Sequence, residues 1–325
     1  MIQFQENIPL AKFSNYKIGG PARYFFEANN LVELEEALRK ARDLNVNVFI
    51  LGGGTNLLVS DAGFDGLVLK PNFALLESDG NVVRAGAGVL MEDLLRFTVD
   101  RKLSGLEWAG GLPGTVGGAV RGNAGAFGEE IKDNAISVQS FNSKDFASIE
   151  RDVLDCKFGY RSSIFKEKKG EEIVLIVTLK LRQGDPEKIN EAIQAKVTYR
   201  HERHPMEYPN IGSIFKNVPV EKVGIDPAAL HENRGGTIRV AIQGAEYTIP
   251  VKIDPFPVVP TAYLISETNL KGTRHGGAMI SEKHPNFIVN VSSATASDVK
   301  YLMGIVREEV KKKFGVDLEQ EVEFL

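Results

Sequence analysis

The stretch GLEWAGGLPGTVGGAVRGNAGAFG, residues 105–128, carries nine glycines in 24 positions. Inside a helix each glycine costs up to about 1 kcal/mol relative to alanine, so we do not expect a stable helix here. Larger side chains are interleaved with the glycines, which argues against a low-complexity linker: Trp108, Leu112, Pro113, Val116, Asn123 and Phe127. We predict a loop with fixed and unusual backbone angles.

A second glycine cluster, LGGGTNLLVSD at 51–61, follows the β-prone run VNVFIL. A backbone that approaches a phosphate closely has no room for side chains, and its free N–H groups then bind the anion. Thr55 and Asn56 add polar side chains directly after the three glycines. Tight turns alone would explain one such cluster. Two clusters about 60 residues apart, each followed by an asparagine, favour a bound nucleotide or dinucleotide.

Neither cluster matches a standard nucleotide-binding motif. Gly52-x-Gly54 and Gly86-x-Gly88 both lack a third glycine three residues on, so the G-x-G-x-x-G pattern fails. The chain has no G-x-x-x-x-G-K-[ST], which excludes a standard P-loop NTPase. The glycine pattern alone therefore leaves the identity of the ligand open.

The composition is that of a soluble globular protein. The chain has 325 residues, 43% of them apolar and 25% charged, which predicts two or three domains. The net charge of -4 argues against a nucleic-acid partner. The start has no export signal, and the strongest apolar run, 173–177, is far below the ~18 residues of a membrane span. We expect a cytoplasmic protein with no membrane partner.

Two sequence features are assigned no chemistry. The single cysteine, Cys156, excludes an intramolecular disulfide and suits a reducing compartment, and we expect it to be a small buried residue. His201-x-x-His204 has no third ligand at a useful spacing, so we predict no metal site.

Hydrophobic periodicity and end signals give a coarse secondary structure. The basic, proline-flanked HERHPMEYPN marks a domain boundary near residue 205. The expected helices are 31–43, 91–102, 185–199, 259–267 and 297–314. The expected strands are 46–51, 67–69, 82–85, 171–181, 286–291 and 317–325, with a hairpin at 236–252.

Eight ordered segments of the chain carry a resemblance to a known family. The segments are NYKIGGPARYFFE (15–27), LGGGTNLLVSD (51–61), GLPGTVGGAVRGNAGAFG (111–128), CKFGYRSSIFK (156–166), YPNIGSIFKN (208–217), NLKGTRHGGAMIS (269–281), NFIVN (286–290) and FGVDLEQEVEF (314–324). They run from end to end and cover essentially the whole chain. In this order they resemble the UDP-N-acetylenolpyruvoylglucosamine reductase (MurB) family.

This resemblance implies an α+β fold. It comprises a two-lobed FAD-binding module of the vanillyl-alcohol-oxidase (PCMH-like) type and a C-terminal α+β substrate-binding domain. We expect the lobes at 1–70 and 71–205 and the substrate domain at 206–305. Residues 306–325 would form a helix end and a strand that carries Glu321 back to the active site.

The resemblance also implies the cofactors, FAD bound between the lobes and NADPH as the hydride donor. No histidine lies between Gly52 and Gly128 and the only cysteine lies outside that range, so we expect the FAD to be non-covalent. The matching FAD-binding positions are Gly52, Gly53, Gly54, Thr55, Asn56, Leu57, Pro113, Gly114, Thr115, Gly117, Gly118, Asn123, Gly125 and Ala126.

The family reaction reduces UDP-N-acetyl-3-O-(1-carboxyvinyl)-glucosamine to UDP-N-acetylmuramate, a step of peptidoglycan synthesis. The resemblance therefore implies an oxidoreductase, UDP-N-acetylmuramate dehydrogenase, that serves cell wall biogenesis, cell shape and cell division. Reduced FAD supplies the hydride and Ser213 the proton. Arg161 matches the arginine that binds the substrate carboxylate and enolate, a planar fork that lysine cannot reproduce.

Glu321 matches the family's assisting glutamate. Glu319 and Glu323 share its strand parity, and the residues alone do not choose among the three. The family pattern L-E-x-E-V selects Glu321.

Substrate contacts implied by the resemblance are Tyr208, Lys216, Asn217 and His284. The chain departs from the family in having Ile211 before Gly-Ser and a long connection at 218–258. A second tyrosine loop found in one subgroup is absent, so the chain falls with the subgroup that uses Tyr208.

Two alternatives stay open on the residues alone. One is another flavin oxidoreductase of the same fold, acting on an alcohol or sugar. The other is a nucleotide-sugar-binding regulator without chemistry, although such a module would need no acid such as Ser213. The expected partners are the UDP-sugar and NADPH, and we favour a monomer.

Overall fold

The computed structural model describes residues 2–230, 236–253 and 256–325. Contacts divide the chain into two compact units. Unit 1 comprises Met1–Phe13, Pro21–Thr55 and Gly63–Glu202, and unit 2 comprises Ser14–Gly20, Asn56–Ala62 and Arg203–Leu325. The division at residues 70, 205 and 305 remains a prediction. The 218–258 connection includes residues 231–235 and 254–255, which lie outside the described residues.

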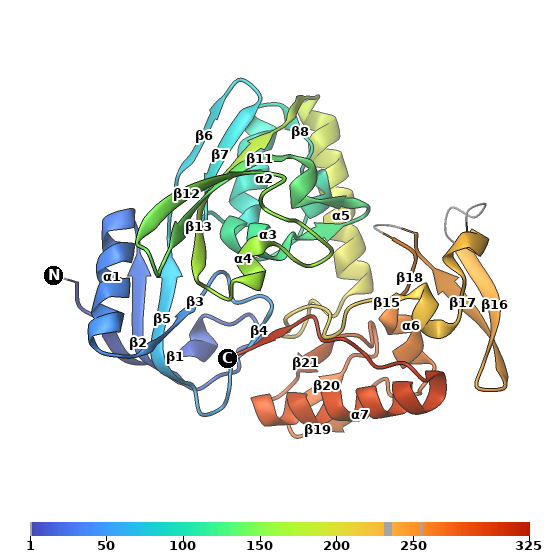
Figure 1. The fold of residues 1–325 in the computed structure, drawn as a ribbon. Coiled ribbons are helices and arrows are strands. Elements are labelled where there is room, and N and C mark those ends of the chain that lie inside the picture. The colour runs from blue at the N-terminus through green and yellow to red at the C-terminus, as the bar shows by residue number, and fades with distance from the viewer. Residues whose placement is uncertain (1, 231–235, 254–255) are drawn as a thin grey trace. The chain divides into compact units, whose positions relative to one another are not determined.

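Unit 1 contains a four-stranded sheet with the strand order β1-β2-β5-β3 (Figure 1). β1 is antiparallel to β2, whereas β2, β5 and β3 run parallel. Helix α1 occupies the predicted residues and buries Leu34 and Leu38 in one cluster with Leu67 and Leu69 of β5. The bounds are β1 Gln5–Pro9, β2 Pro21–Ala28, α1 Leu31–Asp43, β3 Asn47–Ile50 and β5 Phe64–Pro71.

A second sheet of unit 1 is antiparallel throughout, in the order β12-β11-β13-β7-β6. Its hydrophobic cluster includes Val177 of β13, Leu94 of α2, Val120 of α3 and Ile193 of α5. The bounds are β6 Leu76–Asp79, β7 Val82–Gly86, α2 Met91–Asp100, α3 Val116–Gly122, β11 Ala135–Asn142, β12 Ala147–Asp152, α4 Ile164–Glu167, β13 Glu172–Lys180 and α5 Pro186–Arg203. Two short pairs complete the unit, β8 Leu103–Ser104 with β14 Arg182–Gln183, and β9 Gly125–Ala126 with β10 Glu129–Glu130.

Helix α3 corrects the prediction of a helix-free loop across 105–128. Thr115 caps its start by accepting a hydrogen bond from the Gly118 N–H. Asn123 ends it in the left-handed conformation, with φ +42°. Val116 and Val120 are buried in the second cluster. Capping and tertiary packing thus outweigh the low helix propensity of the glycines.

The main hydrophobic cluster of unit 2 is built around the long helix α7. Tyr16 is buried in it, and its hydroxyl donates to the Ile288 carbonyl at 2.6 Å. The bounds are β4 Leu57–Leu58, β15 Val218–Pro219, β16 Gly236–Ile242, β17 Ala245–Val251, β18 Val258–Val259, α6 Thr261–Ser266, β19 Arg274–His275, β20 Ala278–Ile280, β21 Ile288–Asn290, α7 Ala296–Phe314 and β22 Glu323–Phe324.

The predicted hairpin is formed by β16 and β17, and its tip meets the end of α7. With its amide oriented to satisfy both neighbours, Gln243 donates to the Lys312 carbonyl and accepts from the Gly315 N–H, each at 2.9 Å. The predicted last strand is shorter than expected, because only Glu323–Phe324 pairs, in parallel, with the two-residue strand β4. Among the helices of the described residues, none is both long and apolar enough to cross a bilayer.

Candidate active site

The two glycine-rich stretches lie against each other in unit 1. A Cβ atom at Gly53 would lie 2.6 Å from the Cα of Gly114, a distance that real Cβ atoms essentially never show. Gly114 has φ +111°, and a Cβ there would lie 2.9 Å from Thr55 Oγ1. Because the opposing atoms at Gly53 are backbone, the close approach requires glycine at that position.

The backbone after β3 presents N–H groups that the protein does not use. The Leu51 N–H donates to the Leu69 carbonyl at 2.9 Å, in continuation of the sheet. In the described part of the chain, the N–H groups of Gly52, Gly53 and Gly54 have no protein acceptor. Successive free N–H groups in a turn are a binding site for an anion such as a phosphate.

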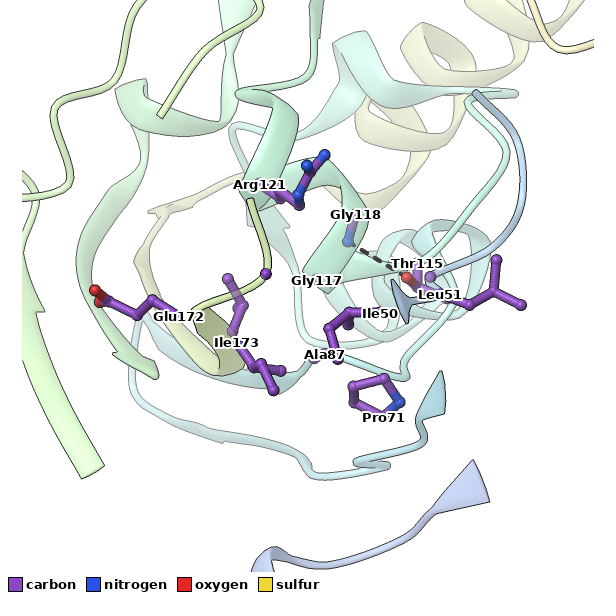
Figure 2. A pocket seen from close by; sticks show the side chains of 13 residues that line it. Ile50, Leu51, Pro71, Ala87, Thr115, Gly117, Gly118, Arg121, Glu172 and Ile173 are labelled. Carbon is purple, nitrogen blue, oxygen red and sulfur yellow. Dashed lines mark hydrogen bonds between the residues drawn. The ribbon is translucent and has the colours of Figure 1, made fainter. Parts of the chain in front are cut away.

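A pocket lies beside these glycines. Figure 2 shows it beneath α3, with the Thr115 hydroxyl bonded to the Gly118 N–H. Its lining combines glycine backbone and apolar side chains with two charged groups: Ile50, Leu51, Gly52, Pro71, Ala87, Thr115, Gly117, Gly118, Arg121, Gly170, Glu172, Ile173 and Val174. This lining suits a ligand with an apolar ring and a phosphate.

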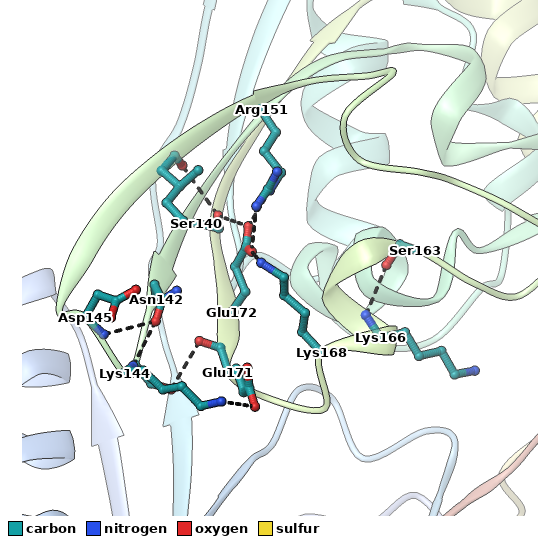
Figure 3. A network of polar contacts seen from close by, with 12 residues as sticks. Ser140, Asn142, Lys144, Asp145, Arg151, Ser163, Lys166, Lys168, Glu171 and Glu172 are labelled. Atoms are coloured by element: carbon teal, nitrogen blue, oxygen red, sulfur yellow. Dashed lines mark hydrogen bonds and ion pairs between the residues drawn. The ribbon is translucent and has the colours of Figure 1, made fainter.

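Glu172 anchors a buried polar network at one wall of the pocket (Figure 3). Its carboxylate is fully buried, and Arg151 donates to both oxygens at 2.6 and 3.0 Å. Lys168 and Ser140 each donate at 2.7 Å. Burial alone would raise the pKa of Glu172, but these hydrogen bonds outweigh it and lower the pKa to about 2. The network therefore stabilises Glu172 as a negatively charged carboxylate at the pocket wall.

Arg161 lies at the tip of a tight turn. Gly159 and Ser162 close the turn with two backbone hydrogen bonds of 3.0 and 3.1 Å. Arg161 has φ +54°, an uncommon conformation for a residue other than glycine. Such conformations persist only where the surrounding structure holds them.

The Arg161 turn is fastened to the end of α3. Asn123 is fully buried, and its Nδ2 donates to the Gly159 carbonyl at 3.0 Å and to Glu130 Oε2 at 2.9 Å. Its Oδ1 accepts from the Lys132 N–H at 3.2 Å. The amide that we expected to face the cofactor is thus engaged by the protein.

Arg200 of α5 is a candidate site residue that the sequence did not indicate. Burial lowers the pKa of Arg200, and the positive charge of Arg161 lowers it further. Its Nε donates to the Gly110 carbonyl at 2.8 Å, while its buried Nη2 has no partner among the described residues. An orphaned buried guanidinium donor fits a bound anion.

A partly exposed aromatic and cationic cluster also involves α5. Phe127, with φ +57°, follows β9 and packs edge-on against Tyr199 with ring centroids 5.2 Å apart. Lys196 Nζ lies 4.4 Å from the Phe127 ring centroid, and Arg200 Cζ lies 5.5 Å from it. Exposed rings flanked by cations suit a nucleotide base and its phosphates.

In unit 2, the segment that carries Ser213 runs antiparallel to the segment that carries Glu321. The Glu321 N–H donates to the Ile214 carbonyl at 2.9 Å, and Phe215 bridges Gln320. On the other side of the C-terminal segment, Asn56 Nδ2 donates to the Glu321 carbonyl at 3.2 Å. The predicted acid and the predicted glutamate are therefore neighbours in the backbone.

The other predicted residues of unit 2 differ in their contacts and in their exposure to solvent. Lys216 forms an ion pair with Glu319, and Asn217 Oδ1 accepts from the Thr261 N–H at 3.2 Å. Tyr208 is 36% exposed. Leu57 is buried within β4.

His284 packs among aromatic rings, with centroids 5.3 Å from His204 and 4.7 Å from Phe287. Burial, followed by the charge of His204, lowers the pKa of His284 to about 4. Its Nδ1 is buried without a partner in the described residues.

The remaining predicted cofactor residues border the glycine contact. Pro113 is exposed next to Gly114. A Cβ at Gly125 would lie 2.5 Å from Glu130 Cγ, so glycine is required where β9 passes β10, and Ala126 is half-buried in β9. Within the described residues, no group of three or more His, Cys, Asp or Glu side chains is arranged to hold a metal ion.

Comparison with known proteins identifies the family. Residues 22–144 match the FAD binding domain model, and residues 204–325 match the model of the UDP-N-acetylenolpyruvoylglucosamine reductase C-terminal domain. The UDP-N-acetylenolpyruvoylglucosamine reductase of Carboxydothermus hydrogenoformans is 37% identical over 323 residues, covering 98% of this chain and 93% of that protein. The chain belongs to the MurB family.

Further MurB proteins support this assignment. The reductase of Caldicellulosiruptor bescii is 34% identical, covering 100% of this chain and 91% of that protein. The crystal structure of MurB from Thermus caldophilus has a TM-score of 0.75 and 29% identity, covering 100% of this chain and 99% of that one. These findings confirm the predicted fold class, an FAD-binding PCMH-type module with a MurB C-terminal domain.

The predicted site residues of this MurB chain are divided between the two units. The structure places Gly52–Thr55, Gly114, Thr115 and Arg161 in unit 1, and it places Asn56, Ser213 and Glu321 in unit 2. Arg200 and Glu172 were missed, because neither has a local sequence signal. Arg200 precedes HERHPMEYPN, where the helix was expected to have ended, but α5 continues to Arg203.

Proposed function

We propose that this chain reduces UDP-N-acetyl-3-O-(1-carboxyvinyl)-glucosamine to UDP-N-acetylmuramate with electrons from NADPH. The observation that carries the proposal is the full-length relationship to MurB reductases, in a chain whose two glycine stretches meet at Gly53 and Gly114. We place the reaction in the cytoplasm, in the synthesis of peptidoglycan precursors.

FAD fits the residues present in unit 1. The free N–H groups of Gly52–Gly54 would hold its pyrophosphate together with Gly114, Thr115, Gly117 and Gly118, and the neighbouring pocket would take one of its ring systems. When bound, FAD supplies the hydride chemistry between NADPH and the vinyl carbon. Cys156 is fully buried, and burial raises its pKa to about 12, so it stays a thiol. This supports a non-covalent cofactor.

Arg161 binds the carboxylate of the enolpyruvyl group in our proposal. Its guanidinium can hold both oxygens and stabilise the negative charge that develops as the double bond is reduced. Arg200 adds a second positive charge that acts on Arg161, and its orphaned Nη2 is an available donor.

Ser213 donates the proton to the carbon that bears the carboxylate. A serine hydroxyl is a weak acid, so neighbouring groups must stabilise the alkoxide that remains. Glu321, whose backbone lies beside Ile214, assists this protonation. Glu319 is paired with Lys216, and Glu321 is the glutamate that the family pattern selects for this role.

The nucleotide part of the substrate has two sets of proposed contacts. Tyr208, Lys216, Asn217 and His284 are the family-matched candidates. Phe127 and Lys196 are added because an exposed ring beside a cation suits a base and a phosphate. We propose that the enzyme acts as a monomer.

The direct test is NADPH consumption by the purified, FAD-loaded chain. We expect oxidation of NADPH to depend on the enolpyruvyl UDP-sugar and to stop when that substrate is exhausted. UDP-N-acetylglucosamine, which lacks the enolpyruvyl group, should support none. Equal consumption of NADPH with both sugars would refute the proposal.

A further inference from the structure

The CKFGYRSSIFK segment contains a residue that the reaction does not explain. Ser163 is fully buried, and its Oγ donates to the Arg121 carbonyl of α3 at 2.6 Å. The same oxygen accepts from the Lys166 N–H at 3.3 Å and so caps α4. One side chain therefore joins the segment of Arg161 to helix α3.

A second bond joins the same two segments on the other side of the turn. Asn123 Nδ2 donates to the Gly159 carbonyl at 3.0 Å. Gly159 and Ser163 flank the Arg161 turn, so α3 holds the turn on both sides. Asn123 is itself held by Glu130 and by the Lys132 N–H, which leaves its amide little freedom to rotate.

Helix α3 also begins in the glycine stretch. Thr115, its cap, borders the pocket together with Gly117 and Gly118. Helix α3, Val116–Gly122, therefore connects the glycine stretch at Thr115 with Arg121 and Asn123, where the two bonds hold the Arg161 turn. A short helix is stiff, so its two ends keep a fixed separation.

We propose that Asn123 and Ser163 are positioning residues, which fix the Arg161 turn to α3 and thereby set Arg161 relative to the bound cofactor. Neither residue touches the substrate in this account. They act by holding a turn whose φ of +54° at Arg161 needs support from its surroundings. The inference rests on the proposed function, because it assigns a position to the carboxylate-binding arginine.

The test compares Ser163→Ala with the wild type in the FAD-loaded, full-length protein. We expect kcat/KM for the enolpyruvyl UDP-sugar to fall by about tenfold or more, since a displacement of about 1 Å can cost on the order of 100-fold. The equilibrium Kd of that sugar, measured from the change in flavin absorbance, should rise as well. The rate at which NADPH bleaches the flavin should change by less than about twofold.

Three variants separate positioning from a loss of stability. Ser163→Thr keeps the hydroxyl, so its substrate Kd should lie close to the wild-type value. Thr98→Val is the matched control, because Thr98 is a buried hydroxyl of the same unit that donates to the Leu95 carbonyl at 2.8 Å. It should lower the unfolding midpoint without changing the substrate Kd. Asn123→Gly keeps the left-handed backbone, removes the bond to Gly159 and should reproduce the Ser163→Ala phenotype.

A double variant gives the decisive result. With Arg161→Ala already present, Ser163→Ala should have no further effect on kcat/KM, because both changes act through the same side chain. Additive losses would overturn the inference, as would a Ser163→Ala enzyme with a normal substrate Kd. A wild-type chain that does not turn over the enolpyruvyl sugar would instead refute the proposed function, and the two failures are therefore distinguishable.

Discussion

Gly53 and Gly114 lie in backbone contact, so close that a Cβ on Gly53 would come within 2.6 Å of the Gly114 Cα. The two residues are 61 positions apart in the chain. Their contact brings the N–H groups of Gly52–Gly54 beside the start of α3, and it makes one site from two glycine stretches. The geometry of the proposed cofactor site therefore depends on residues that have no side chain.

Replacing Gly53 should damage FAD binding. In Gly53→Ala the new methyl group pushes the two stretches apart, and we expect the FAD Kd to rise by roughly tenfold or more, tenfold being about 1.4 kcal/mol. Flavin fluorescence during titration of the apoprotein measures this. Gly304→Ala is the control, because nothing lies within 4 Å of a Cβ there. That helical change should leave the FAD Kd unchanged and raise the stability by up to about 1 kcal/mol.

Arg161→Lys tests the two-point contact with the carboxylate. Lysine keeps the charge but cannot hold both oxygens, so we expect kcat/KM to fall roughly 10- to 100-fold, mostly through weaker substrate binding. Steady-state kinetics with the enolpyruvyl UDP-sugar give the value. Arg84→Lys, at an exposed pair with Glu77, should be neutral. A near-normal Arg161→Lys enzyme would argue against a bidentate contact.

The Glu172 network predicts a specific acid sensitivity. The pKa of Glu172 is lowered from 4.5 to about 2 in the folded state, so its stabilising contribution is complete above pH 4.5 and is lost as the pH falls toward 2. Glu172→Gln should lower the unfolding free energy at pH 7 by on the order of 3 kcal/mol, because Arg151 and Lys168 lose their counter-charge.

The variant should also lose less stability than the wild type between pH 4.5 and pH 2. Urea unfolding across this pH range measures both effects. Glu77→Gln, which removes an exposed carboxylate, is the control. An unchanged stability at pH 7 in Glu172→Gln would show that the network contributes little.

His284 predicts a second pH effect in a different range. Its pKa is lowered from 6.5 to about 4, so the unfolded chain takes up a proton between these values while the folded chain does not. Stability should therefore fall by up to about 3 kcal/mol as the pH drops from 6.5 to 4. His284→Phe keeps a ring in the cluster and should flatten this part of the profile. If the variant and the wild type have parallel profiles, His284 is not the group that titrates.

Ser213→Ala tests the proton donor. The bleaching of bound flavin by NADPH should stay within about twofold of the wild type, because that half-reaction needs no proton from Ser213. Product formation should fall by about 100-fold or more, the usual contribution of a positioned acid. Stopped-flow absorbance separates the two half-reactions. Equal losses in both half-reactions would show that Ser213 is not the proton donor.

Local sequence signals predicted some elements of the fold well. The apolar stripe of Leu34, Leu38 and Ala41 places α1 at its observed residues, and all three side chains are buried. Helix α3 was missed, because its stability comes from the caps at Thr115 and Asn123 and from packing, which no propensity scale contains. The last strand was overestimated, since its length is set by the short partner β4.

The site was predictable only in part, for the same reason. The chemistry of glycine pointed to the two stretches, but their contact at Gly53 and Gly114 forms only in the tertiary structure. Family motifs pointed to Arg161, Ser213 and Glu321. The bond from Asn123 to the Gly159 carbonyl joins residues 36 positions apart, and nothing local marks it.

The most direct test of the proposed reaction follows the flavin itself without oxygen. The FAD-loaded chain is reduced with one equivalent of NADPH, and the enolpyruvyl UDP-sugar is then added. We predict that the absorbance of oxidised flavin returns in proportion to the sugar added and that UDP-N-acetylglucosamine has no effect. A flavin that stays reduced with the enolpyruvyl sugar would contradict the account.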